Sequence, residues 1–192
     1  QREDGEGYIR VSLSFAAHLK DAPVDRVPAH LYLPHGLDPA KPHPAMLVLH
    51  QTHPRGKHDV GPETIADNRG LAAELARRGY VVLAPDYPSF GDYKFDFAAE
   101  FKAGRYVSGT MKGIFNHMRA VDLLSERKDV DKHRIGVIGH SLGGHNAMFL
   151  AAFDERLKVV VTSCGWTPFE DYYDGKIAGW TSDRYMPRLR SV

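Results

Sequence analysis

Four short apolar segments recur along the chain, and longer stretches with helical signals separate them. The segments are residues 45–49, 80–84, 134–138 and 157–163. Continuous apolar runs of this length are typical of strands that are covered on both faces of a sheet. Parallel strands need long crossover connections, which are usually helices and almost always right-handed. The alternation therefore predicts an α/β fold, with a mainly parallel sheet and helices on both of its faces.

The stretches between these strands predict three helices. Residues 62–78 begin with a proline suited to a first helical turn, place Leu71 and Leu75 four residues apart, and precede Gly79, a residue typical of a helix end. Residues 142–153 predict another helix. The remaining one carries an apolar stripe at three- and four-residue spacing, which we expect to face the sheet. That stripe consists of Met111, Ile114, Phe115, Met118, Val121 and Leu124.

The two ends of the chain are less regular. Residues 8–15 and 27–33 alternate weakly between apolar and polar side chains, which predicts two half-exposed strands at a sheet edge. With the four apolar runs, six strands are expected. The tail after Gly165 is aromatic and rich in turn-forming residues, and we predict no regular element there.

Length and composition narrow the class of protein. The 192 residues suit one domain, and 43% hydrophobic with 26% charged residues exclude a disordered chain. The net charge is only +1, so no overall field would attract nucleic acid or an anionic membrane surface. No apolar run approaches the roughly 18 residues that span a bilayer. The single cysteine, Cys164, cannot form an internal disulfide and leaves the compartment open. We expect a small or neutral partner.

A G-x-S-x-G motif lies between the predicted strand 134–138 and the helix that follows it. The motif spans residues 139–143, with Ser141 at its centre. In this setting the turn is so tight that the flanking residues, Gly139 and Gly143, must lack side chains. Ser141 would then project its hydroxyl from a strained turn, and the Leu142 N–H would point from the helix start toward developing negative charge. The alternative is a glycine-rich turn that only packs the helix against the strand.

On this motif the sequence resembles the α/β-hydrolase superfamily, and within it the dienelactone hydrolase and acetylxylan esterase-like branch. Further resemblance lies in residues 27–34, 47–52, 79–86 and 131–136. The resemblance implies a serine hydrolase that needs no cofactor. In this family the loop after the third strand usually reads His-Gly-x, and the third residue supplies the second oxyanion N–H. Here Gln51 occupies the glycine position, and the resemblance assigns the oxyanion role to Thr52.

The histidine and the acid that activate a nucleophilic serine are expected elsewhere. Family order places both after the serine, yet all eleven histidines lie at or before His145. We therefore expect 1–192 to be a single α/β-hydrolase domain that is truncated at its C-terminus and associates with that missing segment. Ending at 163 would leave an apolar strand unpaired at the sheet edge. A naturally short, non-catalytic protein remains an alternative, as does a substitute base.

The loop after residue 49 offers the candidates for such a base and for a metal site. The potential donors there are His50, His53, His58 and Asp59. These side chains suit zinc, but a proline and a glycine within the loop exclude the ligand spacing of a helix face, so we predict no metal site. Nearby, Lys57 and Arg55 are expected to be solvated charges, and Asp86 is expected to cap the turn that follows it.

These observations favour a serine hydrolase of carboxylic esters. Ser141 would attack the acyl carbonyl, and the N–H groups of Leu142 and Thr52 would hold the oxyanion. Gln51, Tyr87 and Trp166 follow strand ends and are expected to line the substrate pocket. The resemblance suggests a small acyl ester or a sugar-linked ester as substrate. An acyl peptidase or thioesterase with the same apparatus, and a non-catalytic scaffold that binds a ligand, are the alternatives.

Overall fold

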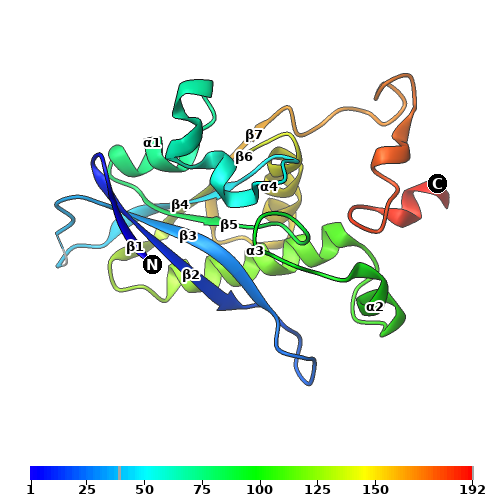
Figure 1. Ribbon diagram of the computed structural model, residues 1–192, viewed down its shortest axis with the longest axis horizontal. Coiled ribbons are helices and arrows are strands. Elements are labelled where there is room, and N and C mark those ends of the chain that lie inside the picture. Colours follow the sequence, from blue (N-terminus) through cyan, green and yellow to red (C-terminus); the bar gives the residue numbers. More distant parts are fainter. Residues whose placement is uncertain (39, 192) are drawn as a thin grey trace.

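The computed structural model describes residues 1–38 and 40–191 and places seven strands in one sheet (Figure 1). The sheet order is β1-β2-β3-β5-β4-β6-β7. The strands are β1 (Arg2–Gly5), β2 (Tyr8–Ala16), β3 (Arg26–Pro34), β4 (His43–Leu49), β5 (Val81–Pro85), β6 (Val130–His140) and β7 (Leu157–Ser163). Strands β5, β4, β6 and β7 pair in parallel, whereas β1, β2 and β3 join by antiparallel pairing. The predicted α/β class is confirmed, with one additional strand, β1.

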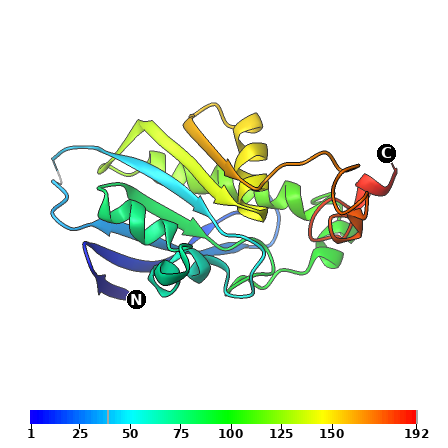
Figure 2. The same cartoon turned by 90° about the horizontal axis from the view of Figure 1, so that it is seen from above.

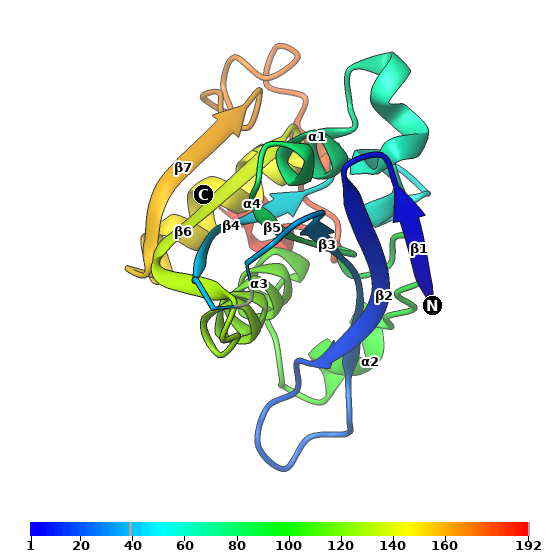
Figure 3. The same ribbon diagram turned by 90° about the vertical axis from the view of Figure 1, so that its left-hand side faces the viewer.

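Three of the four helices connect the parallel strands as crossovers and cover both faces of the sheet (Figure 3). The helices are α1 (Leu71–Arg77), α2 (Phe97–Lys102), α3 (Gly109–Ser125) and α4 (Leu142–Phe153), with 3₁₀ turns at Gly56–Val60, Pro62–Asp67, Ile177–Gly179 and Pro187–Ser191. Alternate residues of β4 show the layering. Leu47 and Leu49 pack in one core cluster with residues of α3 and α4, whereas Met46 and Val48 pack in another with the alanines of α1. None of the described helices has the length and hydropathy needed to cross a membrane.

Two sequence predictions about the helices are wrong in detail. The helix expected over 62–78 is interrupted, because Asn68 adopts a left-handed conformation, with φ 57°, between the 3₁₀ turn and α1. In the apolar stripe of α3, Val121 and Leu124 are fully buried as expected, but Met111 is 51% exposed. Met111 lies in the first turn of α3, where its N–H donates to the Ser108 hydroxyl, and its side chain points away from the side on which Thr110 and Lys112 are buried.

Strand β7 lies at the edge of the sheet opposite β1 (Figure 3). Among the described strands β7 pairs with β6 alone, and Val159, Val160 and Val161 are 55%, 40% and 40% exposed. After β7 the chain runs past the carboxyl ends of the strands to the start of α3, beside α2 (Figures 1 and 2). Backbone hydrogen bonds from Gly109 N–H to Asp183 and from Thr110 N–H to Tyr185 attach the tail there.

Candidate active site

The turn between β6 and α4 holds Ser141 in a conformation that L-residues rarely adopt. Its φ is 53° and its ψ is −117°. Backbone hydrogen bonds fix the turn on both sides: Ser141 N–H donates to Ser163 at 2.8 Å, and His145 N–H donates to Ser141 at 2.9 Å. A conformation of this kind costs about 1–3 kcal/mol and persists where the surroundings over-determine it. The predicted strained turn is therefore present.

Close backbone contacts explain the glycines on either side of Ser141. A Cβ on Gly143 would lie 2.0 Å from the Leu49 carbonyl oxygen, and a Cβ on Gly139 would lie 2.2 Å from the Gly143 carbonyl. Leu49 and Gly139 are also partners in the parallel pairing of β4 with β6. The loop that follows Leu49, with Gln51 and Thr52, therefore leaves the sheet directly beside the Ser141 turn.

Two backbone N–H groups are the candidate oxyanion donors. Leu142 is the first residue of α4, and the first N–H groups of a helix have no acceptor within it. The helix start also carries partial positive charge. Thr52 is exposed, and its hydroxyl lies 3.3 Å from the Tyr185 hydroxyl. The position of Thr52 thus depends on a tail residue as well as on its own loop.

His50 fixes the path of the loop that carries Thr52. Its Nε2 accepts a hydrogen bond from Tyr87 N–H at 2.9 Å, so the ring proton lies on Nδ1, which donates to the Gln51 carbonyl at 2.6 Å. Burial of the ring lowers the pKa of His50, so the imidazole is neutral. The residue that differs from the family pattern, Gln51, therefore has its carbonyl held by a buried imidazole.

The three loop histidines that could substitute for a missing base have other partners. Both ring nitrogens of His50 are engaged, the Nδ1 of His53 accepts from Arg55 N–H at 3.2 Å, and the Nδ1 of His58 lies 3.4 Å from a ring nitrogen of His30. Within residues 1–38 and 40–191, no histidine ring nitrogen forms a hydrogen bond with the Ser141 hydroxyl. The arrangement gives no support to a base from this loop.

Lys57 is buried, and the prediction that it is solvated is wrong. Only 3% of its side chain is exposed, and its ammonium donates to Asp86 at 2.8 Å and to Asp92 at 2.5 Å. The Asp86 carboxylate also accepts from Lys57 N–H and from Asp92 N–H, so it caps the turn as expected. The attraction of Lys57 lowers the pKa of Asp92. This network ties the Thr52 loop to the loop after β5.

The three predicted pocket residues lie in different surroundings. Gln51 lines a cavity of about 330 Å³ beside the Ser141 turn, together with His140 and Ser163. Trp166 is 68% exposed and lines a second cavity of about 390 Å³ between α4 and the tail. Tyr87 departs from its expected place in a pocket wall: its side chain is 1% exposed, because its hydroxyl donates to the Arg184 carbonyl at 2.7 Å beneath the tail.

Trp180 and Tyr185 of the tail lie at the site, and sequence reasoning did not single them out. Trp180 and Tyr185 pack against a cluster that contains Leu142 and Tyr87. Their aromatic character was the available signal, but nothing in the local sequence shows that residues 180–185 return to the Ser141 turn. The described residues contain no group of three or more His, Cys, Asp or Glu side chains placed to hold a metal ion.

Comparison with known families identifies the family of the chain. Residues 28–177 match the profile of the Dienelactone hydrolase family. The chain belongs to the dienelactone hydrolase family. The match covers the loop after β4, the Ser141 turn and part of the tail, so the family resemblance seen in the sequence is confirmed.

Three individual proteins are similar to the chain in sequence or in fold. YtaP of Bacillus subtilis, whose name assigns it provisionally to the hydrolases, is 36% identical over 132 residues, which cover 63% of this chain and 44% of YtaP. Two solved structures share the fold. A Bacteroides fragilis protein provisionally named an acetyl xylan esterase has a TM-score of 0.66 at 21% identity, covering 82% of this chain and 45% of its own. Glucuronoyl esterase from Solibacter usitatus has a TM-score of 0.57 at 24% identity, and the match covers 82% of this chain and 48% of the esterase. The chain spans less than half the length of each.

Proposed function

We propose that the chain carries the nucleophile and the oxyanion site of a serine hydrolase that cleaves carboxylic esters. The observation that carries this proposal is the Ser141 turn, where a positive φ is maintained at the start of α4 between two glycines in backbone contact. A serine that only joins a strand to a helix needs no such strain. The esterase names of two structural neighbours support ester substrates.

The chemistry follows the acyl-enzyme route. The Ser141 oxygen attacks the ester carbonyl carbon while its proton passes to a base, and the N–H groups of Leu142 and Thr52 stabilise the oxyanion. The tetrahedral intermediate collapses and the alcohol departs with that proton. Water then attacks the acyl-serine and releases the acid. This proposal names no histidine and no acid of the triad, because no histidine ring nitrogen in the described part of the chain forms a hydrogen bond with the Ser141 hydroxyl.

Two alternatives remain candidates for the same site. An acyl peptidase or thioesterase would use identical donors and the same nucleophile. A non-catalytic scaffold would keep the turn but bind a ligand without forming an acyl-enzyme. Covalent chemistry at Ser141 separates this last class from the enzymes.

Labelling of the full-length protein with an active-site-directed fluorophosphonate tests the proposal. We expect one label on Ser141, and Ser141→Ala should lose the label together with nearly all hydrolysis of nitrophenyl acetate. The matched control is Ser125→Ala at the end of α3, which should keep both. If Ser141→Ala retains more than about a hundredth of the turnover, Ser141 is not the nucleophile, because removing a triad member usually costs several orders of magnitude.

A further inference from the structure

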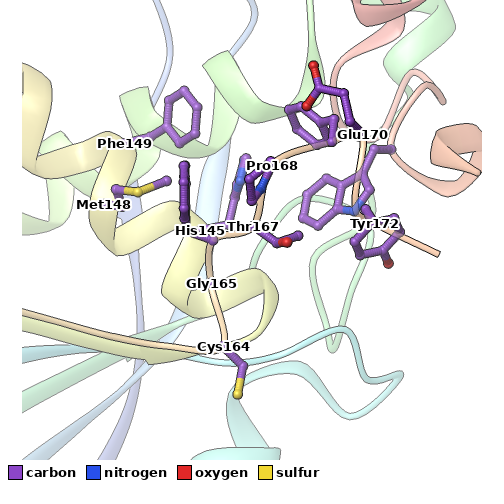
Figure 4. Close-up of a pocket in the computed structure, with 12 residues that line it drawn as sticks. His145, Met148, Phe149, Cys164, Gly165, Thr167, Pro168, Glu170 and Tyr172 are labelled. Carbon is purple, nitrogen blue, oxygen red and sulfur yellow. The ribbon is translucent and has the colours of Figure 1, made fainter. Parts of the chain in front are cut away.

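A cavity of about 390 Å³ lies between α4 and residues 164–180 of the tail. Figure 4 shows His145, Met148 and Phe149 projecting from α4 on one side, with Tyr172 and Glu170 on the other, while Cys164 points away. Its ring-bearing wall residues are His145, Phe149, Trp166, Phe169, Tyr172 and Trp180. An engineered apolar cavity of about 150 Å³ already binds benzene, so this one has room for a substituted aromatic ring.

The cavity borders the Ser141 turn. His145 lies four residues after Ser141, which is about one helical turn or 6 Å along the axis of α4. The Trp180 ring lies 4.7 Å from the His145 ring and 5.2 Å from the Tyr185 ring, whose hydroxyl is 3.3 Å from that of Thr52. Two adjoining aromatic side chains, Trp180 and Tyr185, therefore connect the wall of the cavity with the Thr52 loop.

His145 is the polar group that gives this cavity a chemical preference. The residue is 4% exposed, and its Nε2 has no hydrogen-bond partner within the described part of the chain. Burial lowers the pKa of His145 to about 4, so the ring is neutral at neutral pH. A buried polar atom without a partner costs free energy that a ligand can recover. A ligand hydroxyl suits either tautomer, because it can donate or accept.

The other wall residues favour an uncharged, planar ligand. Aromatic rings pack well against a flat ring in offset or edge-to-face contact. Glu170 is the one charged residue among those lining the cavity, and it is exposed at the rim. A carboxylate or phosphate in the ligand would therefore find no cationic side chain in this wall to balance its charge.

We propose that this cavity binds a neutral phenolic ring of the substrate, with the ring hydroxyl hydrogen-bonded to His145 Nε2. This inference rests on the proposed ester hydrolysis at Ser141, since it assigns the ring to the ester being cleaved. His145 is thus a specificity-determining residue, and the aromatic tail supplies the surface on which the ring packs.

Binding without turnover tests the cavity alone. Calorimetric titration of the full-length Ser141→Ala variant would compare 4-ethylphenol, ethylbenzene and phenyltrimethylammonium. We expect 4-ethylphenol to bind about three- to tenfold more tightly than ethylbenzene, the contribution of one net hydrogen bond. His145→Phe should remove that difference and His145→Gln should retain part of it. The control His133→Phe, at an exposed position near the start of β6, should leave it unchanged.

Activity with Ser141 intact tests the link to the substrate. The kcat/KM for methyl 3-(4-hydroxyphenyl)propanoate should exceed that for methyl 3-phenylpropanoate by a similar factor, and only in proteins that keep His145. Esterase activity without this preference overturns the phenol assignment but leaves the proposed function standing. Phenol binding without any ester hydrolysis overturns the proposed function and the substrate role of the ring. Tighter binding of phenyltrimethylammonium than of 4-ethylphenol would identify a cation cage instead.

Discussion

Replacing Lys57 by methionine should destabilise the protein strongly, although lysine is usually a tolerant surface residue. The change keeps the length of the side chain but removes the charge that faces Asp86. The two side chains are 3% and 0% exposed, and their charged atoms are 2.8 Å apart. Breaking a buried pair typically costs about 3–5 kcal/mol, because the remaining charge stays buried without compensation. Asp86 keeps two backbone N–H donors, so we expect the lower end of that range, about 3 kcal/mol.

Urea denaturation of the full-length protein measures this loss. Lys41→Met is the matched control, because Lys41 is 78% exposed and lies 3.4 Å from Asp38, so its loss should cost less than about 0.5 kcal/mol. Asp86→Asn should in turn reduce the cost of Lys57→Met, with a coupling of at least about 1 kcal/mol in the double-mutant cycle. A loss below about 1 kcal/mol for Lys57→Met, or strict additivity with Asp86→Asn, would refute the reasoning.

The remaining predictions concern the turn, acid stability, metal dependence and the sheet edge. Gly143→Ala should lower the free energy of unfolding by about 1–3 kcal/mol and slow fluorophosphonate labelling of Ser141, because the alanine Cβ would lie 2.0 Å from the Leu49 carbonyl oxygen. Labelling at the normal rate would contradict this. Burial lowers the pKa of His117 to about 3, so the unfolded state binds a proton below about pH 6.5 while the folded state does not. His117 should therefore contribute a fall in stability of about 2 kcal/mol between pH 6.5 and 5, and His117→Asn should make the pH dependence less steep by that amount in urea melts. Chelators should leave esterase activity unchanged. Loss of activity with a chelator that added zinc restores would contradict this prediction. Residues 1–192 expressed alone should lack ester hydrolysis, because no described histidine ring nitrogen forms a hydrogen bond with the Ser141 hydroxyl, and should self-associate through β7, where three valines are exposed. A monomeric, active 1–192 segment in sedimentation and ester assays would be the opposite result.

The local elements of the fold could be predicted closely from the sequence. Helix α4 covers Leu142–Phe153 and strand β7 covers Leu157–Ser163, the same bounds that the apolar pattern indicates. Both follow from residues adjacent in the chain. Helix α4 begins at a tight turn that only glycine permits, and β7 is a run of mostly β-branched side chains. The Ser141 turn was predictable for the same reason, since its glycines and its flanking elements lie within a few residues.

Tertiary structure alone decided the surroundings of Lys57, Tyr87 and Trp180. Lys57 is buried because its partners, Asp86 and Asp92, lie 29 and 35 residues later and reach it only through the pairing of β4 with β5. Tyr87 is covered because Arg184, 97 residues away, lies over it. A single sequence encodes the preferences of neighbouring residues, whereas the burial of a side chain depends on which distant segments the sheet order brings against it. The nucleophile turn was therefore determined locally, and the shape of the site around it was determined by the return of the tail.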